Sequence, residues 1–177
     1  MLSHCSRPKN RDVLLGVLLA TQLIALLYIT SRPSVPREPT KLPDVGDTIR
    51  SVSARVQFRD TVLRFEGSNT THLLISVRST CAWCTEAMPL IREQLPRLRS
   101  KMQVTLVTAE ADTAASRYLR QHGVFAEVLS MAEETSGALG RALTARTPWF
   151  FLIDHQGIVQ RSSHTADLES VDLDSHE

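Results

Sequence analysis

The chain contains 177 residues, of which 42% are hydrophobic. This length suits one globular domain with a short appendage and is too short for two well-packed domains. The 20 basic and 19 acidic side chains nearly cancel, and no aromatic-rich basic stripe occurs, which argues against nucleic-acid binding. Three cysteines are too few for a disulfide-stapled scaffold; Cys5 stands alone, whereas Cys81 and Cys84 form a close pair.

The N-terminal region predicts one transmembrane helix. Residues 13–30 read VLLGVLLATQLIALLYIT and carry no charge, and about eighteen residues is near the lower limit for spanning a bilayer core. Basic residues are denser before this segment, at Arg7, Lys9 and Arg11, than after it, at Arg32 and Arg37. The positive-inside rule then keeps residues 1–12 in the cytoplasm and exports the rest of the chain.

Two other interpretations of residues 13–30 are a cleaved signal peptide and a buried core helix. A signal peptide has a shorter apolar run that ends in a small-x-small cleavage site, and no convincing site follows Tyr28. A core helix fits badly because the segment is apolar on all faces and precedes a Pro-rich stretch. We therefore expect a membrane anchor, followed by a semi-rigid spacer over residues 31–43, which contain four prolines.

Strands alternate with helices over the next 120 or so residues, a pattern typical of an α/β domain with a mixed sheet. We expect strands at 50–57, 59–65, 73–77, 103–108 and 125–129, and helices from the cysteine pair to about residue 100, at 111–122 and at 132–143. A final hairpin is expected from strands 149–154 and 158–161, with its turn at Asp154–Gly157. The domain is expected to cover residues 44–165. Residues 166–177 carry five acids and no Lys or Arg, which favours a solvated, frayed tail.

The cysteine pair lies where a buried strand gives way to a helix. This position puts Cys81 at the helix N-terminus, where free backbone N–H groups and the helix dipole favour the thiolate, so Cys81 is the expected nucleophile. Cys84, one helical turn further, is placed to attack Cys81 and resolve a mixed disulfide.

Other interpretations of the pair are a structural disulfide, half of a metal site, or chance. A zinc site needs four closely spaced ligands, whereas the exported part offers only these two cysteines and scattered histidines such as His72, His122, His155 and His164. We therefore expect no metal site and no cofactor.

The sequence resembles the thioredoxin superfamily over about residues 44–165. Within the superfamily it is similar to the membrane-anchored TlpA-like and ResA-like proteins, and the stretch Ser79–Cys84 is also similar to MauD-like maturation proteins. The residues that carry the resemblance are the strand before Cys-Ala-Trp-Cys, Pro89 inside the helix, Arg146-Thr147-Pro148 before a strand, and the hairpin FLIDHQG. The resemblance implies a three-layer thioredoxin-like fold with a mixed central sheet, and a bend at Pro89 that is structural.

The resemblance also implies a substrate groove. The family's proline at the position of Pro148 is cis and lies beside the active-site cysteines, and the residue before it, here Thr147, offers backbone groups to an extended client segment. The alternative is an ordinary trans proline that begins a strand. The expected substrate-binding residues are Trp83, Thr147 and Pro148.

The chain departs from the family at three positions. Ile75 stands where thioredoxins have a buried Asp that helps to move the proton of the second thiol. Ala87 stands where TlpA-like proteins often have Glu, and the neighbouring Glu86 projects from a different side of the helix. Thr80 stands where a tryptophan usually precedes the first cysteine.

A peroxidase function is disfavoured, although peroxiredoxins share the fold. Peroxiredoxins have Thr three residues before the reactive cysteine, where this chain has Arg78; Thr80 is directly adjacent to Cys81 instead. Two interpretations of Arg78 are electrostatic stabilisation of the thiolate and a solvated surface side chain, of which the second is the simpler.

The sequence therefore predicts a thiol–disulfide oxidoreductase anchored in the inner membrane, with its catalytic domain in the periplasm, that reduces or isomerises disulfides in client proteins. Its expected partners are client thiols and disulfides, a membrane or periplasmic electron donor, and the lipid bilayer through residues 13–30. Two alternatives are a non-catalytic assembly factor that uses the groove to hold a maturing redox enzyme, and a copper-handling protein that binds through both thiolates. Cys5, on the cytoplasmic side, is expected to take no part.

Overall fold

The computed structural model describes residues 16–23 and 41–171. The chain divides into two units, Met1–Glu38 and Pro39–Glu177. In the first unit residues 16–23 are helical. Within the described residues no helix has both the length and the apolar character needed to cross a bilayer. The rest of the expected transmembrane segment, Cys5 and most of the expected spacer lie outside the described residues.

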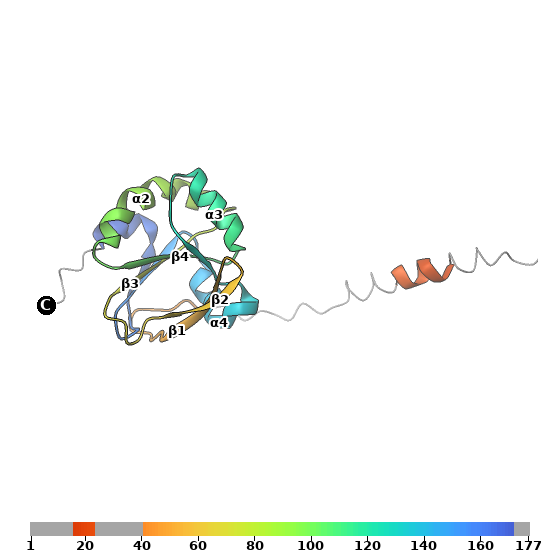
Figure 1. Ribbon diagram of the computed structural model, residues 1–177, viewed down its shortest axis with the longest axis horizontal. Helices are drawn as coiled ribbons and strands as arrows, with labels where there is room; N and C mark the ends of the chain where they lie inside the picture. Colours follow the sequence, from red (N-terminus) through yellow and green to blue (C-terminus); the bar gives the residue numbers. More distant parts are fainter. Residues whose placement is uncertain (1–15, 24–40, 172–177) are drawn as a thin grey trace, which may run out of the picture. The chain divides into compact units, whose positions relative to one another are not determined.

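A seven-stranded mixed sheet forms the centre of the second unit, as described for residues 41–171 (Figure 1). Its spatial order is β2-β1-β5-β4-β3-β6-β7. The strands β3, β4 and β5 are parallel neighbours, whereas β2 and β1 on one side and β6 and β7 on the other run antiparallel to their neighbours. The bounds are β1 Ser51–Val56, β2 Arg59–Arg64, β3 His72–Ser76, β4 Gln103–Thr108, β5 Val128–Ser130, β6 Trp149–Ile153 and β7 Val159–His164.

Helices cover both faces of this sheet, which gives three layers. The helices α2 (Ala82–Arg99) and α3 (Asp112–Gln121) pack on one face, and α4 (Glu133–Thr144) packs on the other (Figure 1). Side chains of the central strands alternate between the two layers: Leu73 and Ile75 of β3 belong to the core under α2 and α3, and Leu74 belongs to the core under α4. Because β3 is buried on both faces, it reads as a continuous apolar run rather than as an alternating pattern.

The β6–β7 turn holds the segment that precedes β1. The Asp154 carboxylate accepts hydrogen bonds from the backbone N–H groups of Gln156 and Ile158, each at 2.9 Å. Gly157 has a φ of +82°, and a Cβ there would lie 2.6 Å from the carbonyl oxygen of Ile49. Glycine therefore lets the segment before β1 lie against the hairpin, where the Ile49 N–H donates to the Gly157 carbonyl at 2.6 Å.

Two boundaries of the domain differ from the expected ones. Pro43 is buried and Leu42 packs on the core under α4, so the last residues of the expected spacer already belong to the domain. The expectation of a frayed tail from Ala166 is wrong for residues 166–171, which continue the 3₁₀ helix η1 (Thr165–Ser170). Leu168 is fully buried and Val171 is 1% exposed, and both pack in the core with α2. Burial of these two apolar side chains orders the segment despite its acidic composition.

Most expected elements have nearly the observed bounds, and three differ. The short strand expected at 125–129 is β5, three residues later, and Phe125 is 75% exposed. The helix α4 is interrupted at Gly137, whose φ is +60°. The strand β7 extends to His164, three residues beyond its expected end.

Candidate redox-active site

Cys81 lies at the N-terminus of α2, as the sequence predicts. It is the N-cap residue, with an extended backbone conformation, and its sulfur accepts a hydrogen bond from the backbone N–H of Cys84 at 3.3 Å. Its side chain is half-buried, and both thiols of the pair are free. The free N–H groups of the first helical turn and the positive end of the helix dipole therefore act on this sulfur.

Cys84 lies one turn further and is fully buried in the core under α2, in the same cluster as Ile75 and Met88. The two sulfurs therefore have different surroundings although they belong to one helical turn. Cys81 is partly exposed to solvent, and Cys84 is not exposed.

The two thiols differ in acidity as well. Burial by itself would raise the pKa of Cys81, but hydrogen bonds with Cys84, with Thr147 and with the backbone of Trp83 outweigh it and lower that pKa below the ordinary thiol value. Burial, together with the interaction with the Cys81 side chain, raises the pKa of Cys84 to about 12. The site therefore has one thiol prepared to ionise and one kept neutral.

Thr147 and Pro148 lie beside the pair because of the sheet register. Strand β6 is antiparallel to β3, with Trp149 opposite Ser76, so the residues before β6 meet the loop that follows β3. The Cys81 thiol donates to the Thr147 carbonyl at 3.4 Å, and the Thr147–Pro148 peptide bond is cis. Both parts of the sequence-based expectation for this proline, its isomer and its closeness to the cysteines, are confirmed.

On the other side of the pair, α3 presents a tyrosine. Tyr118 is 7% exposed, and its hydroxyl lies 3.1 Å from the Thr85 hydroxyl, in the residue that follows Cys84. Burial raises the pKa of Tyr118; the hydrogen bond with Thr85 opposes the shift, and the nearby charges of Cys84 and Cys81 add to it. A neutral phenol therefore packs behind the cysteines.

A carboxylate from the loop after β4 holds the loop before Cys81. The Ser79 N–H donates to Oε2 of Glu110 at 3.0 Å. Glu110 is itself fixed by two further hydrogen bonds, from its N–H to the Thr108 hydroxyl at 3.2 Å and from the Ser130 hydroxyl to its carbonyl at 2.7 Å. Because β3 and β4 are parallel, their carboxyl ends meet at one edge of the sheet, which brings this glutamate to the active-site loop.

The residues that replace the expected Asp and Glu near the cysteines lie where the sequence predicts. Ile75 is fully buried in the same cluster as Cys84, where a carboxylate would otherwise lie. Ala87 packs at the edge of that cluster, and Glu86 is exposed. Ile75 and Ala87 therefore supply no acid or base to the buried thiol of Cys84.

Trp83 is 67% exposed and lies at the mouth of the site. Together with Thr147 and Pro148 it lines a hollow of about 540 Å³ that also includes Ala145, Arg146, Trp149 and His164. The structure therefore brings together all five residues expected at the site. Tyr118, Glu110 and His164 are not foreseen by the sequence, because each lies more than 25 positions from the cysteines and carries no local motif.

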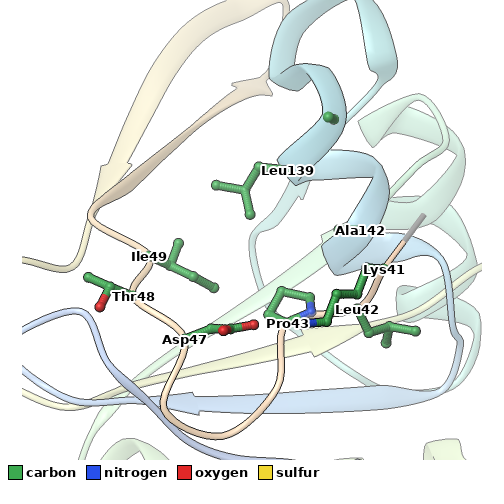
Figure 2. A pocket seen from close by; sticks show the side chains of 9 residues that line it. Lys41, Leu42, Pro43, Asp47, Thr48, Ile49, Leu139 and Ala142 are labelled. Atoms are coloured by element: carbon green, nitrogen blue, oxygen red, sulfur yellow. The ribbon is translucent and has the colours of Figure 1, made fainter. Parts of the chain in front are cut away.

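A second hollow, of about 350 Å³, lies between α4 and the segment before β1. Leu139 and Ala142 of α4 lie on one side, and Pro43, Asp47, Thr48 and Ile49 lie on the other (Figure 2). No cysteine or histidine lines it. Over residues 16–23 and 41–171, no group of three His, Cys, Asp or Glu side chains is arranged to hold a metal ion.

The mixed sheet, the three layers, the cysteine pair at the start of α2 and the cis proline beside it define a thioredoxin-like fold. Solved structures with this fold include a Chlorobium tepidum protein named thiol:disulfide interchange protein DsbE, which is 24% identical, with a TM-score of 0.56 over 72% of this chain and 92% of that one. They also include the thioredoxin domain of a thiol-disulfide oxidoreductase from Bacteroides vulgatus, which is 13% identical, with a TM-score of 0.57 over 72% and 94% of the two chains.

A peroxidoxin, BcpB from Mycobacterium tuberculosis, has the same fold, with 13% identity and a TM-score of 0.56 over 73% of this chain and 99% of that one. These likenesses concern the fold, which oxidoreductases of two kinds share. No protein-family model matches the chain, and no curated protein matches it in sequence.

Proposed function

We propose that the protein is a dithiol–disulfide oxidoreductase that reduces or isomerises disulfides in client proteins. The observation that carries this proposal is the unequal pair: Cys81 is half-buried with a lowered pKa, and Cys84 is fully buried with a raised pKa. This arrangement suits a nucleophile that meets clients and a second thiol that acts only within the protein.

The proposed reaction proceeds in two exchanges. The Cys81 thiolate attacks one sulfur of a client disulfide, which forms a mixed disulfide and releases the other client sulfur as a thiolate. Cys84, after losing its proton, then attacks the sulfur of Cys81, which releases the second client thiolate and leaves a Cys81–Cys84 disulfide. Two electrons pass from the protein to the client, and a dithiol donor must restore them. In isomerisation another client thiolate attacks the mixed disulfide instead, which forms a new client disulfide and releases the Cys81 thiolate, so no donor is needed.

A peroxidase function has less support. The residue three positions before Cys81 is Arg78, so the chain lacks a threonine at the position where peroxiredoxins have one. The peroxidoxin likeness concerns the fold and does not alter this argument.

The proposed location is extracytoplasmic, with residues 13–30 anchoring the domain in the inner membrane. The support for it is the uncharged segment and the denser basic cluster that precedes it. Protease added to spheroplasts is expected to digest the domain after Ser31. Full protection of the domain, with digestion of the N-terminus instead, would refute this topology.

A second candidate function is a non-catalytic assembly factor that binds a maturing enzyme in the groove. The burial of Ile75 in the same cluster as Cys84 favours it, because this position supplies no carboxylate to assist the second thiol. Reduction of insulin by the full-length chain, with dithiothreitol as donor, separates the two functions. The oxidoreductase accelerates reduction, and Cys81→Ser abolishes the acceleration, whereas Cys5→Ser, the matched control, retains it. An assembly factor gives no acceleration above dithiothreitol alone.

A further inference from the structure

The groove beside Cys81 has a marked chemical character. Its aromatic walls are Trp83, which is 67% exposed, and Trp149 at the start of β6. Its charged and titratable residues are Arg146 and His164, and among the described residues that line it there is no Asp or Glu. The groove is thus apolar and aromatic, with a cationic side.

Arg146 is the cation of this groove, and no acidic partner for it lies among the residues that the structure describes. Its guanidinium carbon lies 5.2 Å from the centroid of the Trp149 ring, a cation–π contact that does not need its N–H donors as hydrogen-bond donors. Within residues 41–171 Arg146 forms no ion pair, whereas Lys41, Arg50 and Arg55 each pair with a carboxylate. Asp44 lines an adjoining hollow together with Arg146, and its carboxylate is paired with Lys41 at 3.6 Å.

Trp149 is held in one orientation. Its indole N–H donates to the Ser162 hydroxyl at 2.9 Å, and the ring of His164 packs edge-on against it, with the ring centroids 6.4 Å apart. His164 accepts a hydrogen bond from the Ala166 N–H at its Nδ1, so in the neutral ring Nε2 carries the proton and is a donor. The groove therefore offers a fixed aromatic face with donors on two sides of it.

These features are continuous with the reactive sulfur. Thr147, which accepts from the Cys81 thiol at 3.4 Å, lines the groove together with Arg146. A client segment whose cysteine is attacked by Cys81 must therefore place its neighbouring side chains in this groove. An aromatic side chain fits between the tryptophans, and a carboxylate fits against Arg146.

We propose that this groove selects clients in which the attacked cysteine lies in an acidic, aromatic segment, with Arg146 as the residue that determines the preference for acid. The inference rests on the proposed function and names its substrate class. An exposed ion pair is a small contribution to affinity, so a neutral client is disfavoured by a few-fold, and a basic one, which is repelled, by about tenfold.

The test uses three synthetic peptides with one cysteine next to a phenylalanine. The first has a glutamate on the other side of the phenylalanine, and in the second and third the glutamate is replaced by glutamine or lysine. Each cysteine is joined through a disulfide to thionitrobenzoate. The reduced full-length chain reacts in a single turnover, in which the protein dithiol becomes a disulfide and the peptide thiol and thionitrobenzoate are released.

At low ionic strength the expected rate order for the natural chain is glutamate, then glutamine, then lysine, with about tenfold between the first and the last. Arg146→Glu reverses this order. Arg117→Glu, which reverses an exposed charge on α3 outside the groove, keeps the order of the natural chain. Equal rates for all three peptides with the natural chain, or an unchanged order with Arg146→Glu, would overturn the proposal.

Binding of the same peptides with serine in place of cysteine separates this inference from the proposed function. Fluorescence anisotropy that ranks the serine peptides by charge, together with an absence of exchange with the cysteine peptides, supports the groove specificity and refutes the oxidoreductase. Exchange without any charge preference in rate or binding supports the oxidoreductase and refutes the groove specificity.

Discussion

At the mouth of the site, Cys81 lies among groups that are exposed or half-buried: Trp83, Arg146 and the Thr147 carbonyl. Behind it, Cys84 is enclosed by Ile75, Met88 and the rest of the core under α2. One helical turn separates the two regions. A helix N-terminus and its dipole act on the first sulfur, whereas desolvation acts on the second, so a single motif acquires two chemical functions from its position in the fold.

The largest expected effect is on mixed disulfides formed with clients. Cys84→Ser removes the resolving thiol and leaves the exposed nucleophile, so long-lived disulfide-linked complexes accumulate on non-reducing gels. Cys81→Ser leaves a buried thiol with a raised pKa, and few or no complexes form. The double variant is the control. Equal trapping by both single variants would mean that the two sulfurs are equally accessible and would break the comparison.

The second effect is on alkylation of the two thiols as a function of pH. The lowered pKa of Cys81 places its half-maximal iodoacetamide reactivity below the ordinary thiol value of 9.0, because the thiolate is the reactive form. Cys84, with a pKa of about 12, remains protonated there. In a Cys5→Ser background, mass spectrometry at pH 8 is expected to find Cys81 modified on the order of a thousandfold faster than Cys84.

A further variant sharpens this prediction. Cys84→Ser weakens one of the interactions that lower the pKa of Cys81, so the alkylation profile of Cys81 moves toward higher pH. A profile of Cys81 that is centred above 9.0 in the natural chain would contradict the assignment of the nucleophile.

The third effect concerns the floor of the site, which is the buried core that contains Cys84 and Ile75. Ile75→Asp places a carboxyl in a fully buried position without an assigned partner, so we expect a loss of about 3–5 kcal/mol in the free energy of unfolding. Such a carboxyl has a raised pKa, so the loss is smallest below the unfolded-state value of about 4 and increases as the pH rises through the raised value. Ile75→Asn, which is similar in size and does not titrate, is expected to lose stability without this pH dependence.

The same pair of variants tests whether the missing acid limits turnover. If a buried carboxylate helps Cys84 to lose its proton, Ile75→Asp resolves mixed disulfides several-fold faster than Ile75→Asn at equal amounts of folded protein. Equal rates would show that proximity of the two sulfurs alone sets the rate of resolution.

The mouth of the site could be predicted from the sequence more fully than its floor. The strand, the turn at Cys81 and the helix follow from local patterns, and the strand at Gln103–Thr108 has the expected bounds. The contact between Thr85 and Tyr118 joins residues 33 positions apart, and that between Ser79 and Glu110 joins residues 31 apart. Such contacts depend on how α3 and β4 are placed, which no local pattern specifies.

The ends of the domain show a second reason for error. The composition of residues 166–177 indicates a solvated tail, yet Leu168 and Val171 are buried, and Arg97 of α2 donates to both of their carbonyl oxygens, at 3.2 and 3.3 Å. The exposed Phe58, with a φ of +66° in the β1–β2 turn, is also unforeseen. The Gln57 N–H next to it donates to the buried Asp112 carboxylate, so a tertiary contact offsets an unfavourable backbone conformation.

The smallest expected effect is at the tyrosine behind the cysteines. Tyr118→Phe removes the hydrogen bond with Thr85 but keeps the ring and its packing against His122, so the free energy of unfolding falls by about 1 kcal/mol. A double-mutant cycle with Thr85→Val measures the interaction itself, and Thr85→Ser, which keeps the hydroxyl, is the matched control. Because the raised pKa of Tyr118 keeps the phenol neutral near pH 7, the variant leaves the pH profile of Cys81 alkylation unchanged. A shift of that profile, or slower resolution of mixed disulfides at unchanged stability, would instead show that the phenol takes part in proton transfer at Cys84 and would make the floor of the site as active as its mouth.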